Sequence, residues 1–175
     1  MYAHRFSHQK RLRGTLINLI KETPGLIFDG KTGNPPEEWV FFHLDEWDVP
    51  ALRPAREDYR NNAPILSFVF DNYLDSLDLR LEFGPSDTNV RHRLLEMAHA
   101  DPELFTVAPP FPDPEWVTTI WRMSLLMREE YLEGTDSDRE HLLRERWDTF
   151  LRVVLPRLSD AVRQQEWIRD ANAGA

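Results

Sequence analysis

The feature that most constrains the fold is a short segment in which apolar and charged residues alternate. Its apolar residues are Leu77, Leu79, Leu81 and Phe83, and its charged residues are Asp78, Arg80 and Glu82. Successive side chains of a strand point to opposite faces, so the pattern predicts an antiparallel sheet with one face covered and the other polar. We expect this strand at a half-buried edge of the sheet.

A turn and a helix follow this strand. Gly84 and Pro85 end it, and Ser86 or Asp87 is placed to cap a helix whose apolar residues recur at spacings of three and four. The Pro-rich residues 109–114 come next and predict an exposed crossing. Residues 116–126 are β-prone, and we expect another strand there.

The remaining segments predict a mixed architecture. Residues 9–22 have helical periodicity, while residues 26–29, 39–44 and 65–70 are β-prone runs separated by turn formers. We expect two hairpins, with an irregular connection over residues 45–63. Residues 136–170 carry a wide apolar stripe of helical spacing, interrupted by Pro156, which predicts a kink or a break.

These segments together predict the α+β class. We expect an antiparallel sheet of about five strands, with helices packed on one face and a long, Pro-kinked C-terminal helix. A single domain over residues 1–175 is large enough to bury a core. We expect disorder over residues 1–8 and a frayed tail over residues 171–175.

Composition excludes several classes of site and protein. The 175 residues include no cysteine, which rules out disulfides, cysteine-ligated metals and a cysteine nucleophile. No apolar run approaches the roughly 20 residues that span a bilayer, so we expect no membrane association and a cytoplasmic location. The net charge of −9 disfavours nucleic acid as a partner.

Two groups of residues are candidates for binding an anion or a partner. The first surrounds the helix start after Gly84 and consists of Arg80, Ser86, Arg91 and Arg93. Its alternative is simple capping of the helix, with Asp87 in the place of an anion. The second group, Trp116, Trp121 and Arg122, is suited to stacking or peptide binding, and its alternative is core packing.

A weaker candidate is a metal site. His43 and Asp45 share a face if they continue one strand, and Asp71, Glu37 or Glu38 would have to complete the ligand set. The alternative is an acidic strand end. No phosphate-binding glycine loop and no G-x-S-x-G nucleophile motif occurs, so we assign no catalytic residue and expect no cofactor.

Short motifs in the last 110 residues or so resemble a known family. They are residues 79–87 with Val90 and Arg91, residues 116–122, residues 147–151 and residues 155–158. In combination they look like the C-terminal portion of some bacterial and phage PD-(D/E)XK nuclease-superfamily proteins. The resemblance implies an origin near DNA processing or phage defence, with the nuclease core upstream of the matching part.

The chain departs from that family in its catalytic residues. Nucleases of this type need acids that hold Mg²⁺ and a lysine two residues after the second acid. The lysines here are Lys10, Lys21 and Lys31, and none has that spacing. The resemblance therefore implies a non-catalytic accessory region or a degenerate relative.

Three functional hypotheses follow. The leading one is a non-catalytic binding or accessory domain in a bacterial or phage context, acting with a protein partner or within a larger parent protein. The second is a divalent-metal-dependent phosphoester hydrolase built on His43, Asp45 and either Asp71 or Glu82. The third is an acidic mimic of nucleic acid, which the net charge of −9 would suit. The alternation of the C-terminal acids with arginines argues against this hypothesis. The oligomeric state stays open.

Overall fold

A computed structural model describes residues 2–32, 38–54, 59–73, 75–107 and 117–168. Within these residues, one five-stranded antiparallel sheet has its strands in sequence order. The strands are β1 (Leu26–Thr32), β2 (Trp39–Leu44), β3 (Leu66–Asn72), β4 (Leu77–Phe83) and β5 (Thr118–Leu126). The predicted α+β class and the five-stranded sheet are confirmed.

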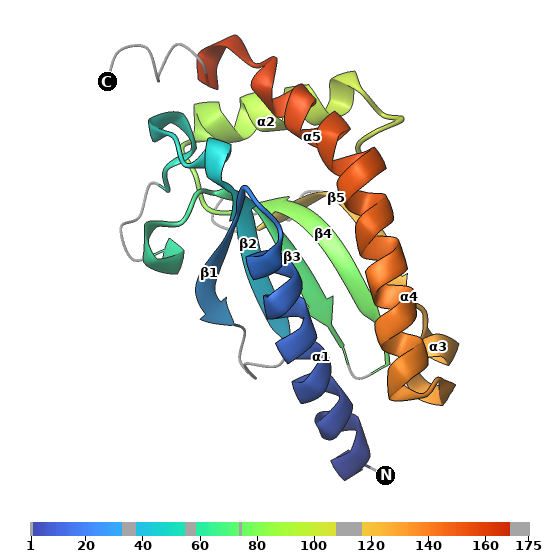
Figure 1. Ribbon diagram of the computed structural model, residues 1–175. Helices are drawn as coiled ribbons and strands as arrows, with labels where there is room; N and C mark the ends of the chain where they lie inside the picture. The colour runs from blue at the N-terminus through green and yellow to red at the C-terminus, as the bar shows by residue number, and fades with distance from the viewer. Residues whose placement is uncertain (1, 33–37, 55–58, 74, 108–116, 169–175) are drawn as a thin grey trace.

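Helices cover one face of this sheet. They are α1 (Tyr2–Glu22), α2 (Thr88–Ala100), α3 (Arg128–Glu133), α4 (Asp136–Thr149) and α5 (Leu155–Arg163), with short 3₁₀ turns η1 (Asp45–Trp47), η2 (Pro50–Leu52) and η3 (Tyr59–Asn62). Figure 1 shows α1 and α4 in front of the sheet, with α2 and α5 near one end of it. Among the described residues, no helix is both long enough and apolar enough to cross a membrane.

Several segments differ from expectation. The strand of residues 77–83 is central, because β4 pairs with both β3 and β5 instead of lying at an edge. Helix α1 begins at Tyr2, although we expected disorder over residues 1–8. The Pro-rich segment 109–114 and the expected frayed tail 171–175 lie outside the described residues.

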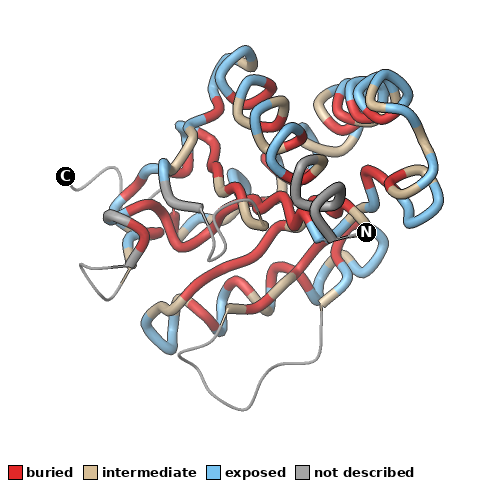
Figure 2. Tube along the Cα trace, turned by 90° about the horizontal axis from the view of Figure 1, so that it is seen from below, coloured by how far each residue is buried: buried red, intermediate tan, exposed pale blue. Residues whose placement is uncertain are grey.

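Aromatic rings join the sheet to the helices. Phe42 stacks on Phe68 with ring centroids 5.1 Å apart, and the Trp147 ring lies 5.7 Å from that of Phe42. Phe150 lies 5.3 Å from Phe68 and 5.2 Å from Trp147. Each such pair stabilises the fold by about 0.5–1.5 kcal/mol beyond the contribution of its buried apolar area. Figure 2 shows buried residues along the strands and on the inner sides of the helices.

A buried amide fixes the end of β3 to two helices. The Asn72 side-chain amide donates to the main-chain oxygen of Gln9 (3.1 Å). The Gln9 side-chain amide in turn donates to the main-chain oxygen of Asn72 (2.7 Å). Tyr131 of α3 donates its hydroxyl to the Asn72 side-chain oxygen at 2.8 Å. These bonds satisfy buried polar atoms and hold α1 and α3 against the same strand.

A π-helical turn, η4 (Phe150–Val154), joins α4 to α5. In a regular α-helix, at ~100° per residue, Val162 would lie about 100° around the axis from Leu143. The turn contains a wider hydrogen bond, from the Leu155 N–H to the Phe150 oxygen. The π turn rotates the chain less per residue than an α-helix does, and this compensates for the difference of about 100°. Leu143, Phe150 and Val162 therefore all face the core. The irregularity predicted at Pro156 is therefore a π turn that ends just before the proline.

We predict that this turn contains one removable residue. Val153 is 56% exposed, and its deletion restores α-helical spacing between Leu143 and Val162. In a Pro156→Ala background, which removes the clash of the ring with the preceding turn, the deletion should keep stability within about 2 kcal/mol of the parent in urea unfolding.

Deletion of Glu145, an exposed residue of α4, is the matched control. In the same background it should rotate Trp147 and Phe150 out of the core and abolish cooperative unfolding. If both deletions were equally damaging, η4 would have no role in restoring the helical register.

Candidate functional site

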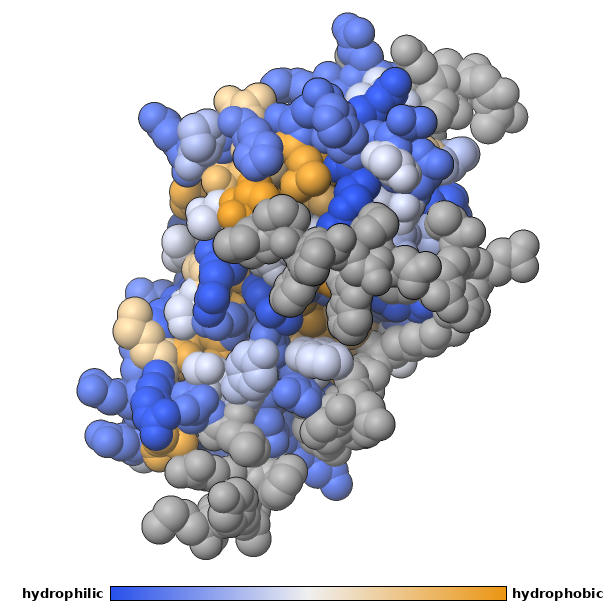
Figure 3. Space-filling model, turned by 180° about the vertical axis from the view of Figure 1, so that it is seen from behind, coloured by the Kyte–Doolittle hydropathy of each residue, from blue (hydrophilic) through white to orange (hydrophobic). Residues whose placement is uncertain are grey.

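The second face of the sheet carries a set of charged residues. Across the strands, Asp71 lies opposite Asp78, and Arg80 lies opposite Arg122. We call this the polar face, and its residues are Asp29, Trp39, Phe41, His43, Asp71, Asp78, Arg80, Glu82 and Arg122. Figure 3 shows the molecule from behind, where hydrophilic residues predominate over the described surface.

The polar face is much more buried than its alternating pattern predicts. Asp71, Asp78 and Glu82 are only 1%, 7% and 5% exposed. Alternation indicates which residues share a face, but it does not reveal what later covers that face. Part of the cover is η3, because Arg60 of this turn bonds to Asp29 of β1. The predicted polar face is present, but its carboxyl groups are largely shielded from solvent.

A three-residue cluster lies at the β1 and β2 end of this face. The Asp29 side chain is fully buried, and its Oδ1 lies 2.5 Å from His43 Nδ1. Its other oxygen accepts a bond from Arg60. The carboxylate is thus held between two donors, which orients the imidazole of His43 with Nδ1 as the donor.

Arg60 has an unusual backbone conformation. Its φ of 46° lies in the left-handed region, where bulky residues seldom occur. Such a conformation costs on the order of 1 kcal/mol and persists only where neighbouring contacts hold it. Here the contacts are the Asp29 carboxylate and the Phe41 ring, whose centroid lies 4.0 Å from the guanidinium carbon. Backbone strain of this kind is concentrated at functional sites.

A pocket of about 310 Å³ opens beside this cluster. We call it the His43 pocket, and its lining includes Ile27, Phe28, Asp45, Asp48, Arg53 and Pro64 in addition to the cluster itself. Arg53 is paired with Asp48 at 2.5 Å. Within the described residues His43 makes no hydrogen bond other than that to Asp29, so Nε2 has no protein partner there.

Other carboxyl groups of the polar face are already paired. Asp71 accepts from Trp39 Nε1 at 3.0 Å and lies 2.9 Å from an Arg80 nitrogen. Burial raises its pKa, an effect that Arg80 partly offsets. Asp78 is bonded to Arg122 at 2.6 Å. These pairs neutralise the acids of this face with arginines.

Glu82 is the exception among these acids. Burial raises its pKa to about 7, while Arg80 and Arg60 act in the opposite direction. No hydrogen bond to its carboxyl group is found within the described part of the chain. Near neutral pH the group exists in both protonation states, so it can donate or accept a hydrogen bond. A perturbed buried acid of this kind marks a candidate functional position.

The predicted anion-binding residues do not form one site. Asp87 caps α2 through the Asn89 N–H at 2.8 Å, and Arg91 is buried with its guanidinium 5.0 Å from the Phe83 ring. Arg93 lies over Trp167 at 5.7 Å. Ser86 Oγ is buried and has no hydrogen-bond partner among the described residues. Arg80 and Arg122 belong to the polar face instead.

The predicted stacking surface of Trp116 and Trp121 is not found among the described residues. Trp121 is 8% exposed and packs in the aromatic core, 5.7 Å from the Phe150 ring. Trp116 lies outside the described residues. For Trp121, the structure therefore supports the alternative, which was packing in the core.

The weak metal set is also dispersed. His43 bonds to Asp29, Asp45 begins η1 after the end of β2, and Asp71 lies opposite Trp39 at the other end of β2. In the described ranges, no group of three or more histidine and acidic side chains is placed to hold a metal ion.

Sequence reasoning missed Asp29 and Arg60. Asp29 ends a short β-prone run, and its contact with His43 depends on the strand register, which places Ile27 opposite His43. Arg60 lies in the irregular connection, where no periodicity indicates a partner. The Asn61-Asn62 pair after it was the available signal, since asparagine tolerates left-handed turns.

We predict that Glu82 makes stability depend on pH. Its folded pKa of about 7 lies above the ordinary 4.5, so the folded state binds more protons and loses stability as pH rises from about 5 to 7. At ~1.4 kcal/mol per pKa unit, the ionised group costs about 3 kcal/mol above that range. Glu82→Gln should therefore be more stable than the parent at pH 8 but not at pH 5, as measured by urea unfolding.

The exposed Glu103→Gln should show no such difference, and equal effects of Glu82→Gln at both pH values would contradict the assignment.

The chain was compared with protein-family models, curated proteins and solved structures. None of the three comparisons gave a match.

Proposed function

We propose that the chain is a non-catalytic binding domain that recognises a protein partner through the His43 pocket. The observation that carries the proposal is the orientation of His43 by a fully buried carboxylate, with a second ring nitrogen left to accept a hydrogen bond. Preorganisation of this kind favours recognition, because the acceptor is already fixed before the partner arrives.

The lining of the pocket suits hydrogen-bond donors on a protein segment. Asp45 is an exposed acid at its wall, next to the Asp48–Arg53 ion pair, and Ile27, Phe28 and Pro64 supply apolar surface. Amide and basic groups complement this combination, whereas phosphates would meet the carboxylates and the overall charge of −9. A protein partner is favoured over nucleic acid for this reason.

The pairing of the buried acids favours binding over metal-dependent hydrolysis. Asp29, Asp71 and Asp78 each accept a bond from an arginine. A metal at Asp29 would have to displace Arg60, whose side chain is itself buried, and the loss of that carboxylate partner is costly. An accessory role in bacterial or phage DNA processing or defence is supported only by the motif resemblance.

The proposal predicts that one ring nitrogen controls partner binding. In His43→Asn, the amide nitrogen takes the place of Nδ1 and still donates to Asp29, but no atom replaces Nε2. We expect a loss of at least about tenfold in affinity for the partner, on the scale of one hydrogen bond. Quantitative affinity capture from cells that naturally contain the protein measures the loss.

The exposed His141→Asn is the matched control. It carries the same chemical change and should capture the partner as the parent does. Retention of the partner by His43→Asn would move recognition away from this pocket.

A second prediction separates binding from the hydrolase alternative. Mg²⁺, Mn²⁺, Ca²⁺ and Zn²⁺ should leave the melting temperature unchanged, because a ligand stabilises a protein only by binding its native state. A rise with any of the four that disappears in Asp71→Asn would favour the hydrolase.

A further inference from the structure

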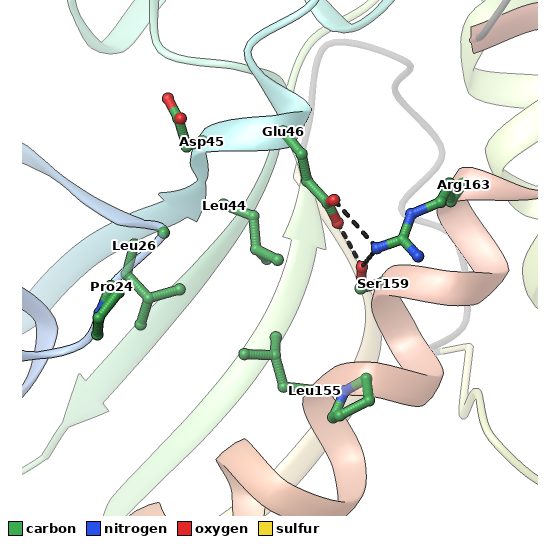
Figure 4. Close-up of a pocket in the computed structure, with 10 residues that line it drawn as sticks. Pro24, Leu26, Leu44, Asp45, Glu46, Leu155, Ser159 and Arg163 are labelled. Carbon is green, nitrogen blue, oxygen red and sulfur yellow. Dashed lines mark hydrogen bonds and ion pairs between the residues drawn. The ribbon is translucent and has the colours of Figure 1, made fainter.

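A second pocket lies on the helix-covered side of the same end of the sheet. Its volume is about 370 Å³, and it is bounded by the turn before β1, the end of β2 with η1, and α5 (Figure 4). We call it the Glu46 pocket. Volumes of roughly 300–1,000 Å³ are typical of small-molecule sites.

Most of its wall is apolar. Pro24, Leu26 and Leu44 lie on one side, and Leu155 lies on the opposite side next to Pro156 (Figure 4). An apolar group of a ligand gains about 25 cal/mol per Å² that it buries against such a surface. The pocket therefore suits a ligand with a compact hydrocarbon or aromatic body.

One end of the pocket is polar and already organised. The Glu46 carboxylate points toward α5, where it accepts a bond from the Ser159 hydroxyl and lies 3.1 Å from an Arg163 nitrogen (Figure 4). Ser159 is only 5% exposed and also accepts a bond from Arg163 at 3.1 Å. These contacts hold Glu46 across the mouth between η1 and α5.

The charge at this end is negative. Arg163 is shared between Glu46 and Asp160, the latter at 3.0 Å. Asp45 also lines the pocket, is exposed, and has no ion pair within the described part of the chain. Two carboxylates, those of Glu46 and Asp45, thus line the pocket against the one guanidinium of Arg163, so the local field favours a cation over an anion.

Two backbone features fix the shape of the pocket before any ligand binds. Gly25 has a φ of 79°, a conformation suited to glycine, and its oxygen accepts a bond from the Asp45 N–H at 2.9 Å. On the other side, the π turn η4 ends where Leu155 and Pro156 enter the wall. Both sides are therefore built into the fold.

We propose that the Glu46 pocket binds a small organic amine, with its apolar body between Leu44 and Leu155 and its ammonium group beside Glu46. The proposal does not depend on the His43 pocket. Of the residues named for this site, only Asp45 also lines the other pocket.

Three phenyl compounds that differ in charge test the proposal. Phenethylamine, 2-phenylethanol and 3-phenylpropionate are titrated into the full chain and followed by NMR chemical shifts. We expect the amine to bind at least about tenfold more tightly than the alcohol, and the acid most weakly. Equal affinities, tighter binding of the acid, or no saturable shifts with the amine would overturn the proposal.

Variants locate the binding. Glu46→Gln still accepts bonds from Ser159 and Arg163 but loses its charge, and it should weaken amine binding severalfold. Asp45→Asn should do the same, while Leu155→Trp should block the pocket. Asp48→Asn alters only the neighbouring His43 pocket and should leave amine affinity unchanged. Shifts that persist in both Glu46→Gln and Leu155→Trp would place the amine elsewhere and overturn the proposal.

Discussion

The structure depends on the stacking of aromatic rings between the sheet and the C-terminal helices. Phe42 and Phe68 on the strands contact Trp147 and Phe150 on α4 and η4. These rings supply much of the apolar burial that offsets chain entropy. With the core on one side of the sheet, the opposite side is free to carry charges.

The ion pairs of the polar face contribute little to the stability of the fold. Burying an ion pair costs desolvation that its attraction seldom exceeds, so paired carboxylates are weak stabilisers. The polar face nevertheless keeps Asp29, Asp71 and Asp78 in such pairs, and it holds Arg60 in a strained conformation. These pairs and the strained Arg60 therefore add little to the stability of the fold, which depends on the aromatic core on the other face.

Local sequence patterns predicted most of the strands and the capped start of α2. Residues 39–44 and 77–83 were placed with the bounds that the structure has, because alternation and turn formers are local signals. The position of β4 in the centre of the sheet was not predicted, since it depends on a strand 35 residues later in the chain, β5. The Asp29, His43 and Arg60 cluster was missed for the same reason, because strand register and a left-handed turn bring it together.

Asp45 stands at the end of β2, where one strand contributes to two pockets on opposite faces of the sheet. A single exposed carboxylate is thereby shared by both. A cation that neutralises it from one side removes part of the attraction felt by a cation on the other. Because such linkage is reciprocal, basic ligands in the two proposed sites would weaken each other's binding through this charge, without any movement of the backbone.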